Sequence, residues 1–243
     1  LRVDDNLGTS TKMPWEAVQA VMDVSEERGI PLATHLFYLD DAKRLLEMGS
    51  DLMGHSVRDT DVDQEFIAML RESGVCYVPT LTREVSTFVY ADRPDFFDDP
   101  FFQRHADAAE VERLSQPELM ARMAESPTAA GYREALDQAM RNVAILDSAD
   151  IPIAMGTDAG PAARFPGYFE HLEIWMMSDA GMSPEDVLLS ATSVAAACAR
   201  APDVGALEPG RWADFQVMAE NPLEDVRATR SLQRVFIGGV EVR

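Results

Sequence analysis

The sequence is poor in cysteine, in lysine and in long apolar segments, and each scarcity excludes a class of protein. Two cysteines in 243 residues, Cys76 and Cys198, are too few for the disulfide framework of a small secreted domain. We expect both to pack separately as small apolar groups, which favours the cytoplasm over secretion. No segment approaches the roughly 18 consecutive apolar residues that a membrane-spanning helix needs, so a soluble chain without a membrane partner is predicted.

Basic residues are also scarce relative to acidic ones. The formal net charge is −21 and the predicted isoelectric point is near 4.4, and Lys12 and Lys43 are the only lysines. A nucleic-acid partner is excluded because phosphate binding needs clustered lysine and arginine. The expected partners are a small-molecule substrate and further copies of the chain in a homo-oligomer.

Apolar segments and amphipathic segments alternate along most of the chain. With 47% hydrophobic residues the chain can bury a substantial core, and alternation of this kind predicts an α/β fold with a parallel sheet covered by helices. The predicted strands are 1–3, 30–35, 51–55, 75–81 and 151–155. The predicted helices are 14–28, 62–73, 131–147, 168–180 and 184–200. A further helix is predicted to have Asp40 as its N-terminal cap and to end at residue 48.

Two segments depart from this alternation. Residues 84–128 are rich in Asp, Phe, Pro and Glu and predict an insertion over the strand ends, where long segments form lids or binding walls. Residues 203–243 carry short alternating runs around Gly238-Gly239, which predict a β-sandwich-like appendage. The predicted division is therefore 1–202 and 203–243.

Three potential metal ligands end predicted strands. His35 ends one strand, His55 ends the next, and Asp158 follows the strand 151–155. In a parallel barrel such ends share one mouth, and imidazole and carboxylate suit a borderline divalent ion such as zinc, with one or two ions bound. Asp158 is also the predicted general base, because a carboxylate there can take a proton from water that the metal activates.

The chain resembles the C-terminal part of a metal-dependent amidohydrolase of the prolidase-like and imidazolonepropionase-like kinds. The matching residues are the strands ending in His35 and in Gly54-His55, the run 156–160, and the closing segment 203–215, with Asn221-Pro222-Leu223 behind it. The resemblance implies strands four to eight of a (β/α)8 TIM-type barrel. It also implies a His-x-His pair and a carboxylated lysine as further ligands. The chain has no His-x-His, the lysine position falls just before Leu1, and neither Lys12 nor Lys43 is a good substitute.

Other polar residues are candidates for substrate contact or support. Tyr38, Tyr132, Arg58, Arg83 and Arg164 could bind substrate, since arginine grips a carboxylate with two parallel bonds; the alternative for each arginine is a surface salt bridge. For His171, on a predicted helix, a role in orienting a ligand or in structure is favoured over metal ligation. His105 is predicted to lie on the surface.

Three functions remain open from the sequence. The favoured one is metal-dependent hydrolysis of an amide or other C–N bond, with a prolidase-like dipeptidase as the substrate class. The second is a mononuclear deaminase of a cyclic amidine or nucleobase. The third is a non-catalytic barrel fragment that acts as a binding partner.

Overall fold

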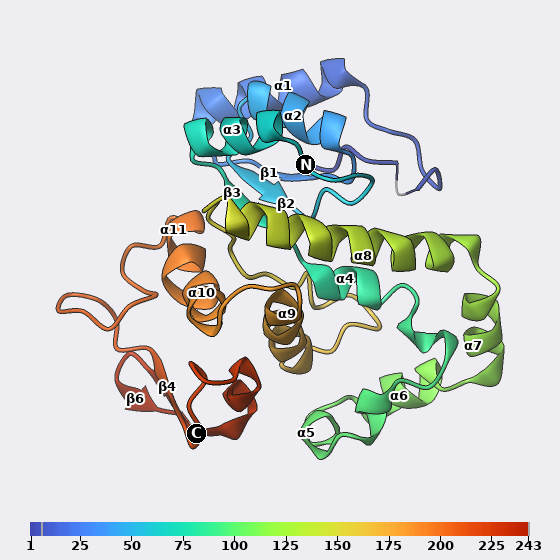
Figure 1. Cartoon of the computed structure of the whole chain (residues 1–243), viewed down its shortest axis with the longest axis vertical. Coiled ribbons are helices and arrows are strands. Elements are labelled where there is room, and N and C mark those ends of the chain that lie inside the picture. The colour runs from blue at the N-terminus through green and yellow to red at the C-terminus, as the bar shows by residue number, and fades with distance from the viewer. Residues whose placement is uncertain (6, 243) are drawn as a thin grey trace.

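Short parallel strands form the sheet that carries the candidate residues (Figure 1). The structure is a computed structural model, and it describes residues 1–5 and 7–242. Strands β1 (Ala33–His35), β2 (Leu52–Gly54) and β3 (Cys76–Val78) pair in that order, all parallel. A parallel bridge from Arg2 to His35 and another from Tyr77 to Ile153 extend the sheet on either side. The predicted parallel α/β sheet is confirmed; over the described residues it is open and does not close into a barrel.

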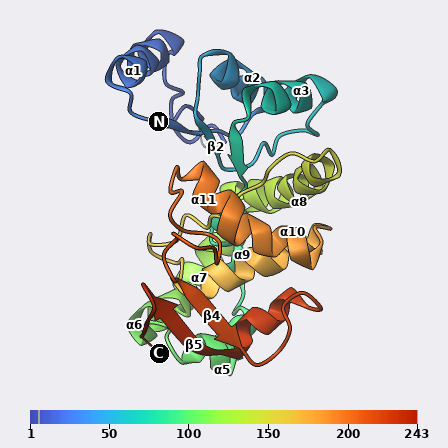
Figure 2. The same ribbon diagram turned by 90° about the vertical axis from the view of Figure 1, so that its left-hand side faces the viewer.

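Helices α1 (Trp15–Arg28), α2 (Leu39–Glu47) and α3 (Gln64–Ser73) lie together at one end of the molecule and cover the outer face of this sheet (Figures 1 and 2). The prediction that Asp40 caps α2 is wrong. The helix begins at Leu39, and the carboxylate of Asp59 accepts the Leu39 N–H at 3.0 Å. A partner distant in sequence therefore replaces the expected local cap.

The other helical elements follow the third strand. They are α4 (Leu81–Val85), η1 (Val89–Ala91), η2 (Asp95–Asp98), α5 (Pro100–Gln103), α6 (Ala108–Leu114), α7 (Pro117–Ala124), α8 (Pro127–Ser148), α9 (Tyr168–Asp179), α10 (Pro184–Leu189), the π-helical turn η3 (Ser190–Val194), α11 (Ala195–Cys198) and η4 (Val226–Ser231). The predicted helix 184–200 is thus one helical run with a π turn inside it. Helix α8 starts earlier than predicted, because Ser126 caps it by accepting the Ala129 N–H.

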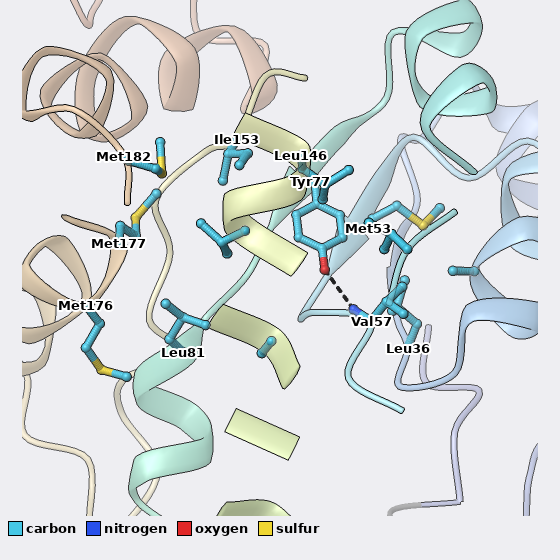
Figure 3. Close-up of a cluster of buried hydrophobic side chains, with 14 of the residues drawn as sticks. Leu36, Met53, Val57, Tyr77, Leu81, Leu146, Ile153, Met176, Met177 and Met182 are labelled. Carbon is cyan, nitrogen blue, oxygen red and sulfur yellow. Dashed lines mark hydrogen bonds between the residues drawn. The ribbon is translucent and has the colours of Figure 1, made fainter. Parts of the chain in front are cut away.

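The core joins the sheet to α8 and α9 (Figure 3). Tyr77 of β3 is fully buried at its centre, and its hydroxyl accepts the Val57 N–H at 2.7 Å, which satisfies the one polar atom of the ring. Ile153 and Leu81 pack on the α9 side together with Met176 and Met177. Each such side chain contributes roughly 1.5–3 kcal/mol on burial, so this cluster fixes the sheet against the helices that follow it.

The segment 84–128 is a chain of short helices that docks through aromatic rings. Phe96 lies 5.2 Å from Tyr168 and Phe102 lies 4.8 Å from Phe165, measured between ring centroids. These contacts hold the segment against the start of α9 and the loop before it.

The tail is one antiparallel sheet of β4 (Phe215–Met218), β5 (Leu232–Ile237) and β6 (Val240–Glu241). Within the described residues it is a single three-stranded sheet and not a two-layer sandwich. The predicted turn at Gly238-Gly239 is confirmed, with φ of 57° and 78°, which glycine adopts without steric cost. The tail lies at the opposite end of the molecule from α1 to α3 (Figure 2).

The expectation that the two cysteines pack separately is wrong. Cys76 at the start of β3 and Cys198 at the end of α11 form a disulfide, with Cα atoms 5.8 Å apart. The cytoplasmic preference drawn from unpaired cysteines therefore loses its basis. Within residues 1–5 and 7–242 no helix is both long and apolar enough to cross a bilayer.

Candidate metal and substrate site

His35 and His55 come together at the carboxyl ends of β1 and β2. Their ring centroids are 4.0 Å apart and the rings meet edge to face at 77°. The pairing of neighbouring parallel strands sets this closeness, because Gly54, just before His55, is the register partner of His35. The predicted convergence of these two imidazoles is present.

One nitrogen of each ring already contacts an oxygen. His35 Nε2 lies 2.5 Å from Oδ2 of Asp4, and His55 Nδ1 is bonded to the hydroxyl of Thr80. Asp4 follows the bridged segment 1–3 and Thr80 follows β3, so all four residues stand at the same edge of the sheet. Contacts of this kind fix the orientation of a ring and direct its other nitrogen toward a ligand.

Both imidazoles favour the neutral form. Burial lowers the pKa of His35, although the carboxylate of Asp4 acts in the opposite direction. Burial lowers the pKa of His55 further, and His35 and the guanidinium of Arg58 add to that effect. Neutral imidazole is the form that binds a metal ion, so the donor chemistry fits a borderline divalent cation.

Asp158 is held away from a ligand set by Arg164. The Arg164 Nη1 donates to the Asp158 carbonyl oxygen at 2.8 Å and also pairs with its carboxylate, while Arg164 Nε donates to Ser86. Across the described parts of the chain, no three His, Cys, Asp or Glu side chains are arranged to hold a metal ion. The structure therefore supplies a histidine pair with Asp4 beside it, and the third ligand is not in place.

Arg58 and Arg83 form a buried cluster with Glu84. Arg58 Nε lies 3.3 Å from Glu84 Oε1, and Arg83 Nη1 donates to Oε2 at 2.9 Å. All three side chains are buried, so the alternative of an ordinary surface salt bridge is wrong for both arginines. Two guanidinium groups share one carboxylate, so these three side chains together carry one positive charge, with the carboxylate of Asp4 also nearby at His35.

Of the remaining candidates, Tyr132 contacts the arginine cluster, and Tyr38 and His171 have other partners. The Tyr38 hydroxyl donates to Asp5 at 2.7 Å, and Tyr132 accepts from Arg83 at 3.4 Å. His171 on α9 is bonded to Thr229 and packs on Phe101, so its contacts are with η4 and α5. His105 is exposed, as predicted, while Lys12 pairs with the buried carboxylate of Asp41 and Lys43 pairs with the exposed carboxylate of Asp63.

Sequence reasoning missed four residues of this region: Asp4, Thr80, Glu84 and Glu173. A signal existed for Asp4, which directly follows the predicted strand 1–3, and for Thr80, which lies near the end of the predicted strand 75–81. No local signal marks Glu173, which lies in an apolar helix. It is fully buried and accepts hydrogen bonds from Leu81 N, Thr82 N and the Thr82 hydroxyl, and burial raises its pKa to about 7.

The chain is similar to known proteins over most of its length. The model of the amidohydrolase family matches residues 9–242. Imidazolonepropionases are among the relatives: that of Streptomyces coelicolor is 34% identical over 73 residues, 30% of this chain and 19% of its own. That of Streptomyces griseus is 30% identical over 117 residues, 47% of this chain and 28% of its own.

Solved structures share the fold. A Xaa-Pro dipeptidase with bound methionine superposes with a TM-score of 0.71 at 23% identity, over 96% of this chain and 50% of that one. An ochratoxinase of A. niger gives 0.66 at 19% identity, over 96% of this chain and 46% of that one. The chain thus spans about half the length of these structures. The match to the family model over nearly the whole chain shows that this chain belongs to the amidohydrolase family, whose members bind divalent metal ions.

Proposed function

We propose that the chain is the C-terminal, ligand-bearing part of a metal-dependent hydrolase of amide or other C–N bonds. The observation that carries the proposal is the pair of imidazoles 4.0 Å apart at adjoining strand ends, of which His55 is buried and His35 is half-buried. One nitrogen of each is engaged, by Asp4 and by Thr80, which leaves the other available. Family membership supports hydrolysis as the reaction class.

His35 and His55 would hold the divalent ion, with zinc as the first candidate. The bound metal would polarise the scissile carbonyl and activate water. Asp158 is proposed as the ligand and proton acceptor that completes the site. Its carboxylate would have to exchange Arg164 for these partners. A carbamate-bearing lysine and a His-x-His pair from preceding residues remain part of the proposal.

For the substrate we propose a dipeptide with a free carboxylate, of prolidase type. The guanidinium groups of Arg58 and Arg83 support this class, since they outnumber the Glu84 carboxylate that they share and a guanidinium group can bind a carboxylate with two parallel bonds. Arg58 Nη2 is buried, and no hydrogen-bond partner for it occurs among the residues the structure describes. Arg164 and Tyr38 stay secondary candidates, because each has a carboxylate of its own as partner, whereas Arg58 and Arg83 share one.

Arg83→Lys tests the substrate class. Lysine keeps the charge but loses the planar fork, so we expect KM for a Xaa-Pro dipeptide to rise about 10-fold or more, with little change for the same dipeptide as its C-terminal amide. The matched control is Arg122→Lys on the exposed face of α7, which should change neither value. An equal rise for both substrates would contradict carboxylate recognition by Arg83.

A second candidate is hydrolysis or deamination of a cyclic amidine or imidazolone ring. The imidazolonepropionase relatives, at 30% identity or more, favour it. Metal content and substrate range separate the two. Near two ions per full-length chain with turnover of Xaa-Pro dipeptides supports the dipeptidase, whereas one ion with turnover of an imidazolone ring supports the alternative.

A non-catalytic role makes a different prediction. A binding fragment would take up no zinc and turn over neither substrate, both as the chain Leu1–Arg243 and as a longer polypeptide that includes the residues before Leu1. Zinc binding and turnover in the longer polypeptide alone would instead show that the missing ligands lie upstream.

A further inference from the structure

The N-terminus of α4 is capped by a side chain from a different helix. The first N–H groups of a helix have no partner inside it, and the residue before the first turn usually accepts one of them. Here that residue is Thr80, and its side chain makes no such bond. Glu173 of α9 replaces it: Oε1 accepts Leu81 N–H at 2.7 Å, and Oε2 accepts Thr82 N–H at 2.8 Å and the Thr82 hydroxyl at 2.7 Å.

The hydroxyl that an ordinary cap would use is bonded to His55 instead. Thr80 stands in the left-handed region at φ 51°, an unfavourable conformation for a β-branched residue, and its Oγ1 contacts Nδ1 of His55. The two roles that one threonine could not perform are thus divided between two residues. Glu173 satisfies the helix, and Thr80 holds the histidine.

We propose that Glu173 is a positioning residue, which caps α4 from α9 so that the Thr80 hydroxyl accepts the Nδ1–H of His55 and leaves the lone pair of Nε2 for a metal ion. The burial of all three side chains supports a fixed arrangement, since Glu173 is 0%, Thr80 5% and His55 8% exposed. The inference rests on the proposed role of His55 as a ligand. Glu173 lies on a helix and not at a strand end, so the proposal extends the set of residues that orient the candidate ligands beyond the strand ends.

The tautomer of His55 tests this directly. The chain has four histidines, so ¹⁵N spectra of the histidine-labelled protein can report each ring without a metal present. Above pH 8, where Glu173 is a carboxylate, we expect Nδ1–H His55 in the natural chain and a loss of that tautomer in Glu173→Gln, since an amide cannot accept both backbone N–H groups. Zinc affinity, measured by competition with a chelator, should fall about 10–100-fold, the usual effect of removing a residue that orients a ligand.

Matched variants separate positioning from stability. Asp63→Asn removes a carboxylate cap from α3, where Asp63 accepts Phe66 N–H at 2.9 Å, and should leave the His55 tautomer and the zinc affinity unchanged. Thr80→Val should reproduce the effects of Glu173→Gln, and the double variant should be no worse than the single ones. If Glu173→Gln fails to fold, Thr82→Val, which removes one of the three bonds, should give a smaller shift in the same direction.

Unchanged His55 signals and zinc affinity within twofold in Glu173→Gln or Thr82→Val, despite lower stability, would overturn the proposal. Strict additivity of Glu173→Gln with Thr80→Val would also overturn it. If the His55 tautomer responds as expected but the protein has no hydrolase activity, the tautomer result would support the positioning role of Glu173. The lack of activity would refute the proposed function.

Discussion

Three residues that end strand segments concentrate the backbone strain of the candidate site. His55, Thr80 and Asp158 have φ values of 72°, 51° and 54°, although none is glycine. Such conformations cost on the order of 1–3 kcal/mol each and persist where surrounding contacts fix them. The structure contains contacts that can fix these conformations: Thr80 with His55, Glu173 with the turn after Thr80, and Arg164 with Asp158. At the scale of residues, the site is therefore held by side chains that sequence motifs do not mark.

Glu173 should also give stability a distinct pH dependence. Burial raises its pKa in the folded chain to about 7 from 4.5, against the opposing effect of its hydrogen bonds. The folded protein keeps a proton that the unfolded chain has released, so the free energy of unfolding should fall as pH rises from about 4.5 to about 7, by up to roughly 3 kcal/mol. Urea denaturation from pH 4 to pH 8 measures this, and Glu173→Gln should lack that component.

The control for this profile is Glu170→Gln on the same helix, which should retain the decline. Parallel profiles for the natural chain and Glu173→Gln would contradict the assignment of the proton to Glu173.

Elements were predictable where local signals and tertiary contacts agree. Helix α3 has its own cap, Asp63, and its own stop, Gly74, and it lies close to the predicted range. Helix α2 begins ahead of Asp40 because Asp59, from the next βα connection, caps it. The predicted strand 151–155 is reduced to one bridge at Ile153, because only one neighbour lies beside it among the described residues. Helix caps and strand pairings that distant segments supply cannot be predicted from the periodicity of the local sequence.

The run 156–160 depends on a close approach that only glycine permits. A Cβ added at Gly156 would lie 2.6 Å from Cγ1 of Val78 on β3. We expect Gly156→Ala to lower the free energy of unfolding by about 1–3 kcal/mol, the usual effect of overpacking, and to disturb the neighbouring Asp158. Thermal unfolding measures the loss, and a second change, Val78→Ala, should restore part of it. No recovery in the double variant would mean that the clash is not the cause.

In the whole molecule, one disulfide and a few polar contacts connect segments that are far apart in the sequence. The disulfide links β3 to α11 across 122 residues of sequence. At the far end, Arg227 of η4 pairs with Asp179 of α9 at 2.8 Å, and Thr229 is bonded to His171. These ties anchor the C-terminal sheet and helices to a core built by the first three strands.

Loss of the disulfide should lower global stability. Cross-linking residues far apart in sequence restricts the unfolded chain, which typically stabilises a protein by roughly 2–4 kcal/mol. Urea denaturation of the Cys76→Ser/Cys198→Ser variant should show that loss, and dithiothreitol should bring the natural chain to the same level without affecting the variant. Two titratable thiols in the unreduced native protein would contradict the bond.

Local patterns were enough to place the first three strands, their helices and two of the site residues. Strand-end positions for His35 and His55 follow from apolar runs and the fixed polarity of parallel strands, both of which are local properties. Which side chains meet became clear only from the folded chain: Asp4 with His35, Arg58 and Arg83 with Glu84, Arg164 with Asp158, Cys76 with Cys198, and Glu173 with α4. These contacts join distant segments, and their partners depend on packing geometry and burial, which a one-dimensional pattern does not contain.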